Sequence, residues 1–206
     1  MNSRHLLLLI ALTLTLAACM SAPSVPSRFY LLSPDPGQPV AGRSAAAPPL
    51  SIGLGPVMLP EVYDRPQIVT RTDDHRIQLA EFDRWGSDLN KDLARTLARN
   101  LMGRLNTDSV VLYPWPGRYK PDFQVRLQFF RLDGELDQTA VLEGVWRLLD
   151  GDRGCELVAR RFSLEEPTTG AGYHGLVAAI SRGVSRLSQE IAEQVAVTRP
   201  GCAPEQ

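Results

Sequence analysis

The side chains that most often do chemistry are sparse in this sequence, which has three histidines and three cysteines. His75 follows Asp73 and Asp74, so a metal site or an acid–base pair is one interpretation, but a solvated hairpin turn fits these residues better. His174 has no carboxylate or cysteine at ligand spacing, and we expect it on the surface. The pattern therefore predicts no catalytic residue, no metal site and no cofactor.

Motifs that bind phosphates or carry a nucleophile do not appear either. Gly53-Leu54-Gly55-Pro56 begins like a dinucleotide loop, but the proline removes a backbone donor and no third glycine follows. The sequence has no G-x-S-x-G elbow, no P-loop and no CxxC pair. Glu165 and Glu166 are adjacent, so on a strand they would point to opposite faces. A hydrolase built on carboxylates alone is the weakest alternative that we keep.

Cys19 stands at the end of an export signal. A basic start is followed by an apolar run over residues 6–16, which is too short to span a bilayer. The tetrapeptide LAAC that ends at Cys19 resembles the lipobox of bacterial lipoproteins. This resemblance implies that residues 1–18 are a signal peptide and that Cys19 carries a covalent lipid, including acyl chains such as palmitate. Residues 19–27 then form a lipidated tether rich in serine, proline and alanine.

The residue after the lipid anchor is Met20 rather than aspartate. By resemblance to enterobacterial sorting, this favours the periplasmic face of the outer membrane. The periplasm is oxidising, so Cys155 and Cys202 could form a disulfide. Cys155 begins a predicted strand and Cys202 follows the last predicted helix. We favour the disulfide, and the sequence leaves two free thiols open as the alternative.

The remaining chain has the composition of one ordinary globular domain. The 206 residues are 44% hydrophobic and 22% charged, with a formal net charge of −1. There is no basic excess that would favour nucleic acid as a partner. We expect a single periplasmic domain over residues 28–200 and a C-terminal tail over residues 201–206.

Two long amphipathic helices are predicted. The first begins after Ser87 or Asp88, a good N-cap, and has a leucine at every fourth position. These leucines are Leu89, Leu93, Leu97, Leu101 and Leu105. The second covers residues 173–197, has one apolar stripe and ends before Pro200.

The predicted strands have β-rich composition and are bounded by turn residues. They cover residues 28–33, 50–59, 67–72, 76–80, 109–113, 122–132, 140–149 and 156–164. The third and fourth strands form a hairpin, and the last three form an antiparallel meander. The Pro/Gly/Ala-rich residues 34–49 are expected to be a long exposed loop. The fold class is therefore an α/β sandwich (α+β), with a mixed, largely antiparallel sheet and the two helices on one face.

Two aromatic patches could contact a partner. Phe82 and Trp85 lie between the hairpin and the first helix, where they form either a partner site or a hydrophobic staple at the helix entry. Trp115 stands between Tyr113 and Tyr119 in a proline-rich loop, which either binds a partner or folds over a sheet edge.

Three sequence runs carry a family resemblance. They are RFYLLSP, then LPEVYDRPQIVTRTDDHRIQLAEFDRWGSDLNKDLARTLARNL, and RRFSLEEPTTGAGYHGLVAAISRGVSRLSQEIA near the end. Together they resemble the PqiC/YmbA-type auxiliary lipoproteins of ABC-type and MCE-type transport systems. The resemblance covers nearly the whole mature chain and brings no catalytic residue with it.

The resemblance implies a non-enzymatic role in intermembrane lipid transport that supports the integrity of the envelope. The lipoprotein would receive the tip of a periplasm-spanning MCE-domain protein at the outer membrane. Because such a partner is a ring, the lipoprotein itself could assemble as a homo-oligomeric ring. Arg65, Arg71, Phe82, Trp85 and Trp115 are the candidate partner contacts. The alternatives are a lipoprotein that binds lipid directly, which predicts an apolar cavity, or one that assembles another outer-membrane complex.

Overall fold

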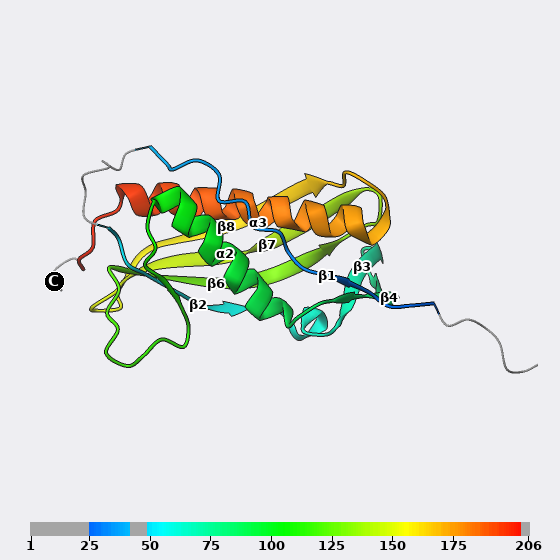
Figure 1. The fold of residues 1–206 in the computed structure, drawn as a ribbon, viewed down its shortest axis with the longest axis horizontal. Helices are drawn as coiled ribbons and strands as arrows, with labels where there is room; N and C mark the ends of the chain where they lie inside the picture. The colour runs from blue at the N-terminus through cyan, green and yellow to red at the C-terminus, as the bar shows by residue number, and fades with distance from the viewer. Residues whose placement is uncertain (1–24, 42–48, 203–206) are drawn as a thin grey trace, which may run out of the picture.

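The computed structural model describes residues 25–41 and 49–202 (Figure 1). The predicted signal peptide, Cys19 and most of the tether lie outside these ranges, so their assignments stay predictions. The described residues contain two sheets, two long helices and a short 3-10 helix, which share one hydrophobic core. This architecture confirms the predicted α+β class.

The larger sheet, which we call the large sheet, has five strands in the order β5-β2-β6-β7-β8. Its strands are β2 (Ile52–Met58), β5 (Val110–Leu112), β6 (Phe123–Gly134), β7 (Thr139–Asp150) and β8 (Glu156–Pro167). The last three form the predicted antiparallel meander, whereas β2 pairs in parallel with both β5 and β6. The sheet is therefore mixed but largely antiparallel.

The predicted hairpin belongs to a separate sheet, which we call the small sheet. Its strands are β1 (Arg28–Tyr30), β3 (Gln67–Asp73) and β4 (Arg76–Trp85), in the order β1-β4-β3. The strand β4 continues five residues beyond its predicted end at Ala80, because its distal half pairs in parallel with β1. The short helix η1 (Glu61–Tyr63) connects the large sheet to the small one.

Both long helices pack on the same face of the large sheet (Figure 1). Helix α2 (Leu89–Leu105) begins at Asp88, whose side chain accepts a hydrogen bond of 3.0 Å from the Lys91 amide. Helix α3 (Gly172–Val197) lies over β7 and β8 and packs against α2. The leucines predicted to face the sheet are all buried, at 3% exposure or less. None of the helices in the described residues is long and apolar enough to cross a membrane.

Residues 31–41, which we call the strap, lie across the two helices instead of forming a free loop. The Asp35 amide donates to Asn100 Oδ1 at 2.7 Å, and Arg104 Nη1 donates to the Pro36 carbonyl at 2.7 Å. Most of the strap is exposed, as predicted for the start of this loop. Its backbone is nevertheless fixed by polar side chains of α2, because it has no β partner to bond with.

A disulfide joins Cys155 to Cys202, with Cα atoms 6.0 Å apart. It connects the start of β8 to the residues that follow α3. The Gly201 amide also donates to Asp150 Oδ2 at 2.8 Å, so the same region is fixed by a second contact. The C-terminal end of the domain is thereby tied to the turn between β7 and β8.

Replacing both Cys155 and Cys202 by serine is expected to lower the free energy of unfolding by about 4 kcal/mol. The bridge closes a loop across 47 residues, and an open chain has more conformational entropy when unfolded. Urea denaturation followed by tryptophan fluorescence measures the change, with the wild-type protein under reducing conditions as the matched control. Equal midpoints for the oxidised protein and the double variant would contradict a stabilising bridge.

Candidate functional site

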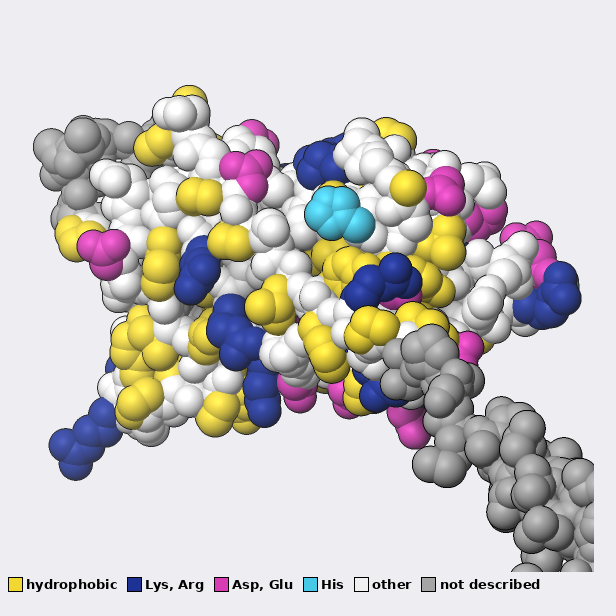
Figure 2. All heavy atoms as spheres, turned by 45° about the vertical axis from the view of Figure 1, so that its right-hand side comes forward, with side chains coloured by type: hydrophobic (Ala, Val, Ile, Leu, Met, Phe, Trp, Pro, Cys, Tyr) yellow, Lys and Arg dark blue, Asp and Glu magenta, His cyan; other side chains and the backbone are white. Residues whose placement is uncertain are grey.

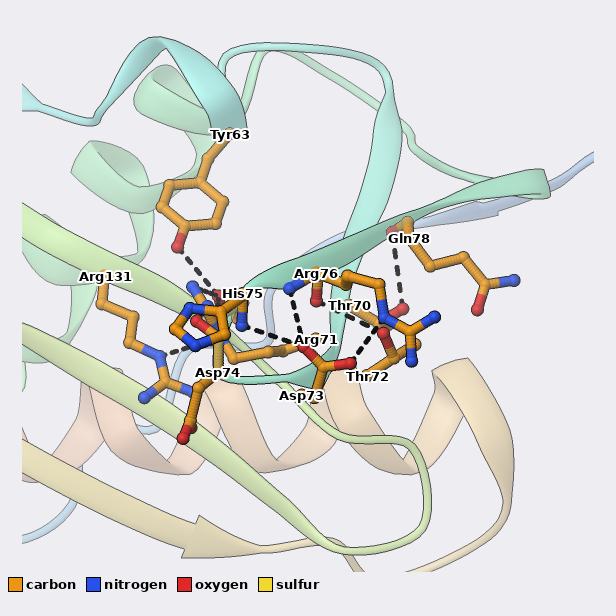
Figure 3. A network of polar contacts seen from close by, with 11 residues as sticks. Tyr63, Thr70, Arg71, Thr72, Asp73, Asp74, His75, Arg76, Gln78 and Arg131 are labelled. Atoms are coloured by element: carbon orange, nitrogen blue, oxygen red, sulfur yellow. Dashed lines mark hydrogen bonds and ion pairs between the residues drawn. The ribbon is translucent and has the colours of Figure 1, made fainter.

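The most buried charged group in the described part of the chain is the carboxylate of Asp133, near the end of β6. Its side chain has no exposed surface. Tyr63 Oη donates to Asp133 Oδ2 at 2.9 Å, and Arg71 Nη2 donates to the same oxygen at 2.9 Å. Arg131 Nε donates to Oδ1 at 2.6 Å. In Figure 3, Tyr63, Arg71 and Arg131 converge from η1, β3 and β6.

The protonation states in this cluster suit its hydrogen bonds. Burial raises the pKa of Tyr63 above its usual value, and the negative charge of Asp133 adds to the effect. The hydrogen bond to Asp133 raises the pKa of Arg71. Both groups therefore keep their protons and act as donors to the carboxylate. These hydrogen bonds hold Tyr63 and Arg71 in place around the buried carboxylate.

The surroundings of Arg71 indicate a structural role rather than the partner contact expected from the sequence. The sequence presents Arg71 as a partner contact, but its side chain is mostly buried and bonds Asp133 through both Nε and Nη2. It joins β3 of the small sheet to β6 of the large sheet. We therefore assign Arg71 a structural role, because a guanidinium held this way cannot turn toward a partner without leaving a buried charge unpaired.

A second buried carboxylate, Asp83 on β4, fixes the first strand. Arg28 donates to both of its oxygens, at 2.8 Å and 2.7 Å, and Tyr30 Oη donates to Oδ1 at 2.7 Å. Burial alone would raise the pKa of Asp83, but the hydrogen bonds from Arg28 and Tyr30 outweigh it and hold the pKa below its usual value. Sequence analysis did not find this clamp, because Arg28 and Tyr30 are more than fifty residues away from Asp83.

Arg65 and Trp85 are brought together beside the start of α2. They line a surface hollow of about 300 Å³ with the residues on either side of them. Trp85 is only 7% exposed and belongs to the core. The partner contact of Trp85 stays a prediction, and its burial favours the alternative of a hydrophobic staple at the helix entry. Arg65 is half-buried and remains accessible from the hollow.

The other two candidates lie apart from this hollow. Phe82 is half-buried within β4. Trp115 is half-buried, and its ring lies on Gly53 of β2, where an added Cβ would come within 3.2 Å of it. Tyr113 meets that ring edge-on, with centroids 5.3 Å apart, and is 57% exposed. The loop thus covers one end of the large sheet and still presents an aromatic side chain to solvent.

The face of the large sheet turned away from α2 and α3, which we call the open face, was not singled out from the sequence. Cross-strand pairs on it join Met58 to Gln128, and Arg126 to Arg147. Met58 and Phe130 are 48% and 49% exposed. Two arginines directly opposite each other are unfavourable in an antiparallel pair. The alternation of apolar and polar residues in β6 was the signal that could have revealed this face.

The histidines and carboxylates do not assemble a reactive centre within residues 25–41 and 49–202. His75 lies in the exposed turn between β3 and β4, where its amide donates to Asp73 Oδ1 at 2.9 Å (Figure 3). His174 is exposed near the start of α3. No group of three or more histidine, cysteine, aspartate or glutamate residues in this part of the chain could hold a metal ion.

The described residues form an α+β domain in which buried carboxylates join one strand to another. The chain belongs to the family of ABC-type transport auxiliary lipoprotein components, which matches residues 30–192. This confirms the PqiC/YmbA-type resemblance. The family consists of transport components and is not an enzyme family. No curated protein matches the chain.

Solved structures share the fold at low sequence identity. An uncharacterized protein is 22% identical with a TM-score of 0.67, over 83% of this chain and 99% of that one. Protein XCC0632 from Xanthomonas campestris is 15% identical with a TM-score of 0.67, over 83% and 95% of the two chains. A dodecameric PelC from Paraburkholderia phytofirmans is 12% identical over 76% and 94% of the chains, but its TM-score of 0.42 is too low to bear on this protein's assembly.

Replacing Asp133 by asparagine is expected to lower the free energy of unfolding by about 3 kcal/mol, because two guanidinium groups lose a buried counter-charge. Arg71 and Arg131 are partly exposed to water, so the expected loss lies at the lower end of the range for breaking a buried ion pair. Denaturant unfolding gives the value. The exposed Asp74 on the neighbouring turn is the control, and Asp74→Asn should change stability by less than about 0.5 kcal/mol. Equal effects of the two substitutions would contradict the structural role of the cluster.

The Asp83 clamp predicts a loss of stability in acid. Because its pKa is lowered on folding, the contribution of Asp83 is complete above the unfolded value of about 3.9 and disappears as the pH falls through the folded value. The free energy of unfolding should therefore decline more steeply below about pH 4 in the wild type than in Asp83→Asn. Asp64→Asn, at an exposed carboxylate, is the control. Parallel curves for all three proteins would show that the clamp contributes nothing.

Proposed function

We propose that this lipoprotein is anchored to the periplasmic face of the outer membrane and docks the end of an MCE-domain protein there, as part of a Pqi-like lipid transport system. The family match over residues 30–192 carries this proposal, because it makes the chain an auxiliary component of a transporter. The LAAC sequence supports the anchor through Cys19. The anchor needs more than one acyl chain to be durable, which the lipobox chemistry supplies.

The packing of the described domain favours docking over direct lipid binding. The side chains between the helices and the large sheet are almost completely buried, including Phe123, Leu127 and Trp146. Four hollows formed by the described residues have volumes of about 200 to 330 Å³ and are open to solvent. Pockets that bury drug-sized ligands begin at about 300 Å³, and a two-chain lipid needs more than that.

The open face of the large sheet is the surface that suits a protein partner. Phe130 and Arg161 border one hollow, and Met58 and Arg147 border another. Exposed apolar groups beside arginines are typical of the residues that dominate protein interfaces. A partner that supplies carboxylates would also relieve the repulsion between Arg126 and Arg147. We therefore propose the open face, with Tyr113 near the β5 edge of the sheet, as the docking surface, and Arg65 stays a separate candidate contact beside the start of α2.

The proposed mechanism is physical. A lipid anchor confines the domain to one membrane, so a partner that arrives there meets it at a high local concentration and can be held by modest contacts. A ring of lipoproteins would match the symmetry of a ring-shaped partner and multiply each contact.

The test is a pull-down of the tagged lipoprotein from native membranes in mild detergent, followed by mass spectrometry and the native mass of the complex. We expect an MCE-domain or ABC-transporter subunit at stoichiometric level. Phe130→Glu should lower its recovery about tenfold or more, because it places a charge within the apolar part of the docking surface.

The matched control is Ile77→Glu, which alters a residue 41% exposed on the small sheet and should leave recovery unchanged. A monomer without partners would contradict the docking function. Equal recovery with both variants would keep the function and reject the open face as its surface.

A further inference from the structure

Three of the exposed apolar side chains in the described residues gather at the N-terminal end. Val25 is 56% exposed, Phe29 66% and Leu31 55%. They lie within seven consecutive residues, at the point where the tether joins the domain. The open face and docking partner proposed above do not involve them.

The outward position of Phe29 is enforced by the Asp83 clamp. Arg28 and Tyr30 both bond Asp83, so these two side chains lie on one face of β1. Successive side chains of a strand point to opposite faces, and Phe29 is therefore turned away from the clamp. Its exposure follows from a strand that is fixed by Arg28 and Tyr30 to the buried carboxylate of Asp83.

Basic side chains border the same surface. Lys91, Arg95 and Arg99 are exposed and recur every four residues, so they form one stripe along α2. Leu31 shares a hollow of about 270 Å³ with Arg95 and Arg99. Figure 2 shows hydrophobic and basic side chains next to each other on the face that it presents.

The acidic residues next to this stripe already form hydrogen bonds and ion pairs. Asp92 is 7% exposed, accepts a hydrogen bond of 2.8 Å from the Leu32 amide and lies 3.7 Å from Arg95. Asp88 caps the helix and lies 3.9 Å from Lys91. The exposed surface along α2 therefore keeps a positive balance.

The length of the tether places this surface close to the lipid anchor. Val25 is six positions after Cys19. A chain of six residues spans at most about 22 Å even when fully extended. An anchor at Cys19 thus keeps Val25 within that distance of the bilayer, and Phe29 and Leu31 follow four and six residues later. This step rests on the proposed acylation of Cys19.

We propose that Val25, Phe29 and Leu31, together with Lys91, Arg95 and Arg99, form a contact surface for a phospholipid bilayer. The three apolar side chains enter the headgroup region, and the cations of α2 bind the phosphates of anionic lipids. An apolar patch beside lysines and arginines is the usual pattern of proteins that lie in the membrane interface. The contact fixes the orientation of the domain on the membrane, which a lipid anchor alone does not do.

The experiment uses the mature lipidated protein reconstituted into vesicles of phosphatidylethanolamine and phosphatidylglycerol that carry brominated acyl chains. Bromine quenches tryptophan only at contact. Phe29→Trp places the probe in the proposed surface. The control is Val197→Trp, at a residue 70% exposed at the far end of α3 from β1 (Figure 1). We expect quenching of Phe29→Trp to exceed that of Val197→Trp by about threefold or more, after subtracting the wild-type signal.

The basic stripe is tested in the same assay. Adding Arg95→Gln and Arg99→Gln to Phe29→Trp should reduce quenching by about half or more in vesicles with phosphatidylglycerol. The same change should have little effect in vesicles of phosphatidylcholine alone, which carry no net charge. Both substitutions are at exposed positions, so the fold should tolerate them.

The outcomes separate this proposal from the one on which it rests. Protein that does not float with the vesicles would overturn the acylation of Cys19 and this surface together. Protein that floats but shows equal quenching for Phe29→Trp and Val197→Trp would overturn the membrane contact and leave the anchor standing. Protection of Phe29→Trp from aqueous acrylamide without bromine quenching would mean that protein covers this surface, which also overturns the proposal.

Discussion

The buried carboxylate of Asp133 determines where the small sheet lies on the large one. It pairs with Arg71 of β3 and Arg131 of β6 and holds Tyr63 of η1, so three elements from different parts of the chain meet at one charge. A charge in that position needs all of these donors, because an unpaired carboxylate away from water is very costly. The strands β3 and β4 are thereby placed, and β4 in turn carries Asp83, which fixes β1. The start of the domain is therefore connected to the sheet core through two buried carboxylates, Asp83 and Asp133, each of which pairs with an arginine.

The two faces of the large sheet have different roles. Helices α2 and α3 cover one face and supply most of the core, so that face determines the stability of the domain. The other face stays open, with apolar and basic side chains at its surface. An antiparallel sheet can leave one face in water without loss of backbone hydrogen bonds, and this leaves a broad surface available to a partner. A transport component that acts by contact requires such a surface more than it requires an enclosed pocket.

The polar residues of α2 and α3 hold segments without regular structure. The strap is bonded by Asn100 and Arg104 of α2, and Arg104 also donates to Ser185 of α3. These polar side chains stand at positions where an amphipathic helix would be expected to bury only apolar groups. Each of these buried side chains has a partner, so the cost of removing it from water is offset. The strap connects β1 to the segment before β2 and keeps the N-terminal end of the domain close against the helices.

The main helices and strands, the α+β class and the family could be predicted from the sequence alone. Leucines at every fourth position and the meander of alternating strands are local patterns, and local patterns do not require knowledge of the fold. It also supplied both cysteines of the disulfide and the LAAC sequence at Cys19. The structure was needed to show that the hairpin belongs to a separate sheet, that Trp85 is buried, that Arg71 pairs with Asp133 and that Phe29 is exposed. The positions of Arg71 and Phe29 depend on pairs between distant residues, Arg71 with Asp133 and Arg28 with Asp83, and sequence spacing carries no record of which carboxylate an arginine will meet.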